Sequence, residues 1–232
     1  IGFIVITKLE LYYLYETYEE GLNLNPELDK LNKTVMATAY DVEHSFYAFM
    51  TCAAAYDKTN KKEQRQAKRR MKKEYKQMRK WHDHYPVNTY HLVYMMESEF
   101  ARIKGDGQVA ISCLKKAIET ATENDFLQYK ALANKLLGKL YLSLNEKRVA
   151  SLYLTDAYYD YQVWGATEVL TFLKEQYAPY LDLGALQRQS GSQQTLTISG
   201  TSSSQSGTEE KGGIDLGTVT KAAQAISGEV VL

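Results

Sequence analysis

Apolar residues recur at spacings of three and four through most of the first 181 residues, which is the periodicity of one face of an α-helix. The segment 89–104 shows it clearly, with Val93, Met96, Phe100 and Ile103 on one face. The 232 residues contain three prolines, so long helices meet few interruptions. The pattern predicts an all-α fold. We expect helices over about 3–18, 34–56, 60–82, 89–104, 107–123, 126–144, 147–163 and 166–177.

Small residues and turn residues recur in the later helices at an offset of about 40 residues. The matching positions are Val109 with Val149, Ala110 with Ala150, Ala117 with Ala157, and the turn residue Gly105 with Asn145. Two antiparallel helices and their turns need about that length, and alanine at equivalent positions lets helix backbones approach closely. The sequence therefore predicts a helical-repeat (α-solenoid) array, in which stacked neighbours bury each other's apolar faces. Gly165 should end a further helix, and Asp125 should cap the next one.

Composition divides the chain into three parts. Residues 1–181 form the helical-repeat region, and residues 182–213 form a flexible, disordered linker rich in Ser, Gly, Thr and Gln. Residues 214–232 return to helical patterning, either as the start of a coiled coil that forms a homodimer or as an amphipathic helix packed on its own domain. The predicted coiled-coil seam consists of Leu216, Val219, Ala223, Ile226 and Val230. Both ends lie in apolar runs, so we expect a longer polypeptide.

Four sequence motifs carry a resemblance to a known family. They are ALAN at 131–134, YLTDAYY at 153–159, WGA at 164–166 and DLGTVTKAAQAISGE at 215–229. With these motifs the chain resembles the TPR-like helical region of large hybrid signalling proteins. In those proteins a serine/threonine kinase-like domain and an AAA ATPase domain precede this region, and a GAF domain and often a sensor histidine kinase follow it.

The resemblance implies a function through contacts with other protein domains. The chain would be a cytoplasmic, non-catalytic module for protein–protein interaction and interdomain coupling in a signal-transduction kinase of the two-component type. Its partners would be the flanking ATPase and GAF or kinase domains, and residues 214–232 would lead into the GAF domain. The resemblance implies no cofactor for this region.

Positive charge is concentrated between residues 58 and 80. This stretch holds twelve of the 28 Lys and Arg residues but only Glu63 and Glu74 as acids, although the formal net charge of the chain is zero. An apolar seam of Ala67, Met71, Tyr75 and Met78 predicts that one face packs inward. The outer face is either a solvated helix surface or, in a stand-alone scaffold, a docking surface for an acidic partner or, less favoured, nucleic acid. The candidate partner-binding residues are Lys68, Arg69, Lys72 and Lys76.

A second candidate surface is the aromatic stretch near residue 160. Tyr158, Tyr161 and Trp164 could line a groove that binds a peptide, because aromatic side chains bury much area at low entropic cost. The alternative is that these rings pack in the core and between repeats.

The sequence contains no signature of catalysis. It lacks a phosphate-binding GxxxxGK[ST] loop and a nucleophile GxSxG motif. His82, His84 and His91 lie close in sequence without CxxC or HExxH spacing, so we predict no metal site. Cys52 and Cys113 lie in apolar helical stretches, typical of buried thiols in a reducing cytosol. We predict no catalytic, cofactor-binding or metal-binding residue, no enzyme activity and no membrane span.

Overall fold

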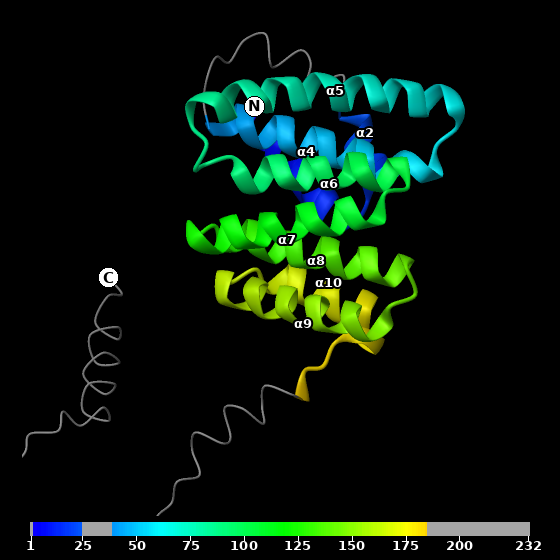
Figure 1. Ribbon diagram of the computed structural model, residues 1–232, viewed down its shortest axis with the longest axis vertical. Coiled ribbons are helices and arrows are strands. Elements are labelled where there is room, and N and C mark those ends of the chain that lie inside the picture. Colours follow the sequence, from blue (N-terminus) through cyan, green and yellow to red (C-terminus); the bar gives the residue numbers. More distant parts are fainter. Residues whose placement is uncertain (1, 25–38, 185–232) are drawn as a thin grey trace, which may run out of the picture. The chain divides into compact units, whose positions relative to one another are not determined.

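The computed structural model describes residues 2–24 and 39–184, and this part of the chain is helical and without β-strands (Figure 1). The all-α prediction is confirmed for these residues. The α-helices are α1 (Gly2–Leu14), α2 (Tyr18–Asn23), α4 (Ala39–Ala55), α5 (Lys61–His84), α6 (Tyr90–Lys104), α7 (Gly107–Glu123), α8 (Leu127–Ser143), α9 (Lys147–Trp164) and α10 (Thr167–Tyr177). Two 3-10 helices, η1 (Tyr56–Lys58) and η2 (Ala178–Tyr180), complete the description.

The turns that connect α6 to α10 share one backbone geometry. Each contains a residue with a left-handed conformation, namely Gly105, Asp125, Asn145 and Gly165, so these residues recur every 20 positions. At each turn the residue that follows donates its backbone N–H to a carbonyl five positions back, as Asp106 does to Ala101 at 2.9 Å. Equal turns join helices of 17 or 18 residues in α7, α8 and α9, and successive helices lie side by side (Figure 1).

The helix ends at Gly105, Asn145 and Gly165 agree with the sequence prediction, but the role assigned to Asp125 was wrong. Phe126 occupies the N-cap position of α8 and makes no side-chain capping bond, while Asp125 adopts a φ of 58° in the turn. Asp is among the few residues with a side chain that tolerate this conformation.

Small residues bring α6 to α9 close together. The four alanines that match across the 40-residue offset, Ala110, Ala117, Ala150 and Ala157, are fully buried. Gly138 of α8 lies directly against Leu154 of α9, and a Cβ added at Gly138 would come within 2.6 Å of Leu154 Cγ. At this point a large side chain of α9 packs directly against the backbone of α8.

Helix α5 begins and ends with local signals. Asn60 accepts hydrogen bonds from the backbone N–H groups of Lys62 and Glu63, and Glu63 accepts one from the backbone of Asn60, which makes a capping box. The helix ends at His84, two residues before Pro86. Met71 and Met78 are fully buried, so the predicted apolar seam faces the core.

The N-terminal segment departs from the expected single helix over 3–18. Glu16 has a φ of 59° and separates α1 from α2. Its carboxylate forms ion pairs with Lys135 Nζ at 3.1 Å and with Lys139 Nζ at 2.8 Å. It also accepts a hydrogen bond from the hydroxyl of Tyr177 at 2.8 Å. These contacts to α8 and α10 compensate the backbone conformation, and they join segments more than 100 residues apart.

Several sequence predictions fall outside the described residues. Of the predicted linker 182–213 the structure describes residues 182–184, and the terminal segment 214–232 with the seam from Leu216 to Val230 is outside it. Likewise, the predicted helix over 34–56 is described from Ala39 onward. None of the helices in the described segments combines the length and the apolar character that a membrane crossing requires.

Candidate protein-interaction site

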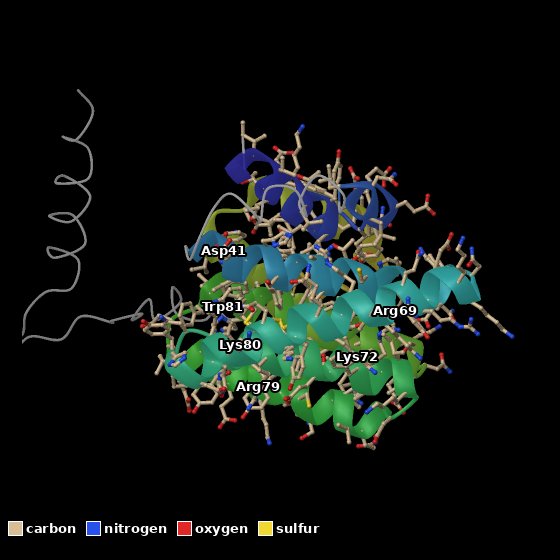
Figure 2. All side chains as sticks on the ribbon, turned by 90° about the horizontal axis from the view of Figure 1, so that it is seen from above. Asp41, Arg69, Lys72, Arg79, Lys80 and Trp81 are labelled. Atoms are coloured by element: carbon tan, nitrogen blue, oxygen red, sulfur yellow. The ribbon has the colours of Figure 1, made fainter. Side chains whose placement is uncertain are left out.

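The exposed face of α5 carries a dense row of cationic side chains, which we call the basic face. It consists of Lys61, Lys62, Arg65, Lys68, Arg69, Lys72, Lys73, Lys76, Arg79 and Lys80, all exposed. Figure 2 looks onto α5, and Arg69, Lys72, Arg79 and Lys80 lie along its length. Glu63 is the one exposed acid between Lys61 and Lys80, and the capping box already uses it. The four predicted partner-binding residues of this stretch, Lys68, Arg69, Lys72 and Lys76, are therefore all at the surface.

The second acid of this stretch, Glu74, points inward. Its side chain is 3% exposed and pairs with Arg70 Nε at 2.7 Å. Lys68, Lys72 and Lys76 make no ion pair with any residue in the described part of the chain. Two cations of the basic face do contact other side chains: Lys73 Nζ lies 3.8 Å from Glu74 Oε1, and Lys68 Nζ lies 5.1 Å from the centroid of the Tyr56 ring. Both lysines remain exposed, so solvent or a partner can still reach them.

A groove of about 620 Å³ runs beside the basic face, between α5, α6 and α7. Lys72 belongs to both the basic face and the groove, and Lys104 also lines it. Its floor is apolar: the ring of Tyr75 meets the ring of Phe100 edge-on with centroids 5.4 Å apart, and Val109 is 48% exposed. The hydroxyl of Tyr75 donates to Glu97 Oε1 at 2.6 Å, which fixes the tyrosine ring. This groove could not be predicted from the sequence, because its walls come from three helices.

Trp164 lines a different pocket, of about 700 Å³, at the ends of several helices. The other aromatic residues around it are Trp81, Tyr85, Phe126 and Tyr129, from segments far apart in sequence. Glu43 also lines the pocket, and burial together with nearby Glu10 raises the pKa of its carboxyl. An apolar pocket with a carboxylate at its wall can hold an apolar group that carries a positive charge.

Tyr158 and Tyr161 do not join Trp164 at the surface. Tyr161 is fully buried and Tyr158 is 7% exposed. Burial raises the pKa of the Tyr161 hydroxyl far above its usual range, with Glu10 and Glu16 adding to the shift. These two tyrosines pack in the core, which is the alternative that the sequence left open, whereas Trp164 is 39% exposed.

The most strongly perturbed charged groups lie in the interior and have structural partners. Burial lowers the pKa of Lys135 to about 8, although Glu16 opposes the shift. Burial alone would raise the pKa of Glu16, but Lys135 and Lys139 outweigh it and lower that pKa to about 2. Lys135 Nζ also donates to the carbonyl of Leu14 at 2.8 Å. The cluster joins the end of α1 and the turn at Glu16 to α8 and α10.

The histidines named in the sequence analysis are spread over different environments. His82 Nδ1 lies 3.0 Å from Thr89 Oγ1, and His84 is exposed. His91 is fully buried between the rings of Phe126 and Tyr129, and burial lowers its pKa to about 4. In residues 2–24 and 39–184 no group of three or more His, Cys, Asp or Glu side chains is arranged to hold a metal ion.

Comparison of this chain with protein-family models, with curated proteins and with solved structures finds no match in any of the three.

Proposed function

We propose that this chain is a TPR-like helical-repeat scaffold without catalytic activity, which binds other protein domains and couples them within a multidomain signal-transduction kinase. The observation that carries the proposal is the recurrence of one turn geometry every 20 residues from Gly105 to Gly165. Pairs of similar helices that stack in this way present an extended surface for protein partners. The motifs at 131–134, 153–159 and 164–166 support the two-component signalling context and a cytoplasmic location.

The placement of charge supports the same function. Ionisable groups in the interior, such as Glu16 and Lys135, pair with each other, whereas exposed cations gather outside on α5. A scaffold needs a stable interior and a recognisable exterior, and electrostatic complementarity supplies specificity and rapid association more than affinity.

Cross-linking of the full-length natural protein through its lysines, followed by mass spectrometry, tests the proposal. We expect cross-links from exposed lysines of residues 61–184 to a flanking domain, and a change in their yield when nucleotide is added. Exclusive cross-linking within residues 1–232, or ATP hydrolysis by this chain alone, would refute the proposed function.

The second candidate function is a stand-alone helical scaffold whose basic face binds an acidic partner or nucleic acid. The ten exposed cations of α5 favour it. Nucleic-acid binding through phosphates weakens steeply with salt, because counterions are released on binding. A titration of the chain with duplex DNA at increasing salt therefore tests the nucleic-acid alternative, which requires binding that is tight at low salt and weakens steeply as salt rises.

A further inference from the structure

The cations of the basic face include a nearly straight row along α5. Lys61, Arg65, Lys68, Lys72, Lys76 and Arg79 follow one another at spacings of three and four residues, so they share one side of the helix. With a rise of 1.5 Å per residue, the row extends over roughly 27 Å. A second helix with acidic residues at the same spacings would place a carboxylate opposite each cation along this length.

The groove adds an apolar element in the middle of this row. Lys72 lines it from α5 and Lys104 from α6, while Tyr75, Phe100, Val109 and Cys113 supply apolar surface between them. Two carboxylates also line it, and both have partners: Glu97 accepts from the Tyr75 hydroxyl at 2.6 Å, and Asp106 accepts from the backbone N–H of Val109 at 3.1 Å. Val109 is 48% exposed, so part of this surface faces solvent. An apolar side chain of a partner placed in the groove would bury Val109. The residues next to that side chain in the partner would then lie within reach of both lysines.

We infer that α5 and the groove beside it form a docking site for an acidic helical protein segment that carries an apolar anchor residue. The carboxylates of the segment would pair with the row from Lys61 to Arg79, and its apolar side chain would fill the groove between Lys72 and Lys104. The inference rests on the proposed role in protein binding and names the chemistry of the partner.

The groove favours a protein segment over the other polyanions. A nucleic-acid backbone could satisfy the cations, but it has no aliphatic side chain to cover Val109 and Phe100. A flat anionic lipid surface could contact the row of cations without entering a recess between three helices. Apolar anchors that fill pockets dominate protein–protein affinity, while ion pairs at the rim set orientation and association rate.

Fluorescence anisotropy with the full chain and a labelled synthetic peptide tests the inference. The probe is a helical peptide with glutamates at spacings of three and four and one central leucine. A second peptide with serine in place of leucine measures the contribution of the groove. We expect the leucine peptide to bind about tenfold more tightly than the serine peptide, because a buried leucine contributes on this scale.

Charge-reversal variants test the contribution of the basic face. The variant Lys68→Glu, Lys72→Glu, Lys76→Glu should weaken binding of both peptides by about tenfold or more. The control variant carries the same change of charge at exposed sites on α7 and α9, and should bind both peptides within about twofold of the parent chain. The control substitutions are Lys115→Glu, Lys147→Glu and Arg148→Glu.

A single substitution tests the groove. Val109→Asp places a carboxylate in the apolar floor, while an acid in the first turn of α7 suits the helix dipole and leaves folding intact. It should remove the advantage of the leucine peptide over the serine peptide. Equal affinity of the parent chain for both peptides would overturn the inference, as would unchanged binding by the triple α5 variant or tighter binding of duplex DNA. If the parent chain bound neither peptide while the full-length protein still gave cross-links to a flanking domain, this site would be refuted but the proposed function would not.

Discussion

The close contact between α8 and α9 gives a quantitative prediction for Gly138→Ala. The new Cβ would lie 2.6 Å from Leu154 Cγ, 2.9 Å from Leu154 Cδ2 and 3.2 Å from the Leu154 backbone nitrogen. Because the backbone of α9 is among these atoms, rotation of the leucine side chain alone cannot relieve the overlap. Overpacking of a dense core costs about 1–3 kcal/mol. Alanine returns about 1 kcal/mol of helix propensity relative to glycine.

The overlap is severe and includes a backbone atom, so we expect a cost at the upper end of this range, about 2–3 kcal/mol, which exceeds the gain in propensity. The free energy of unfolding should fall by about 1–2 kcal/mol, which lowers the melting temperature of a domain of this size by roughly 2–8 °C. Urea and thermal denaturation followed by circular dichroism measure both quantities. In a Leu154→Ala background the cost of Gly138→Ala should become smaller, because the two shortest contacts, to Leu154 Cγ and Cδ2, are removed while the 3.2 Å contact to the backbone nitrogen remains.

Gly107→Ala is the matched control for this prediction. A Cβ at Gly107 would lie 3.8 Å from the nearest atom, Leu144 Cδ2, which is ordinary van der Waals contact. This variant should be as stable as the parent chain or more stable by up to about 1 kcal/mol. If Gly138→Ala matched the parent in stability while Gly107→Ala behaved as expected, the close packing of α8 on α9 would be disproved.

Three further variants test other features. The parent chain should lose about 3 kcal/mol of stability between pH 6.5 and pH 4, because His91 takes up a proton near pH 6.5 in the unfolded chain but only near pH 4 in the folded chain. His91→Leu should remove this part of the pH dependence, and equal urea midpoints of variant and parent from pH 7 to 4.5 would contradict it. Glu16→Gln should cost about 3–5 kcal/mol at pH 7 by leaving Lys135 buried without its anion. That loss should shrink as pH falls from 4.5 toward 2, where the parent carboxylate also becomes protonated. Gly165→Ala should cost about 1–2 kcal/mol because its φ is 83°, whereas an unchanged melting temperature would place the left-handed residue elsewhere.

The helix boundaries of the second half could be predicted because their signals are local. Gly105, Asn145 and Gly165 each end a helix with residues that tolerate a left-handed backbone, and apolar spacing identifies the helices between them. Asp125 was misassigned because the same residue type serves both as a helix cap and as a left-handed turn residue. Local sequence alone does not distinguish these two roles.

The break between α1 and α2 and the grooves could not be predicted, because the residues that form them are far apart in the sequence. Nothing near Glu16 indicates a turn, since the groups that hold its carboxylate, on Lys135 and Tyr177, come from distant helices. The basic face was visible as a run of charge, but the groove beside it requires knowledge of which helices become neighbours. For Tyr161 the sequence left two alternatives open, a surface groove and the core, because an aromatic side chain suits both, and burial in the structure agrees with the core.

The ion-pair cluster at Glu16 also bears on how the polypeptide is made. A ribosome produces α1 and α2 well before α8 and α10. The carboxylate of Glu16 therefore has no ion-pair or hydrogen-bond partner from α8 or α10 until Lys135 and Tyr177 emerge, 119 and 161 residues later. Meanwhile the hairpins from α6 to α9 form through short-range contacts, which are kinetically favoured. The segment around Glu16 leaves the exit tunnel before helices α4 to α10, yet it would be among the last of the described segments to reach its final position. During that interval its apolar side chains remain exposed to aggregation.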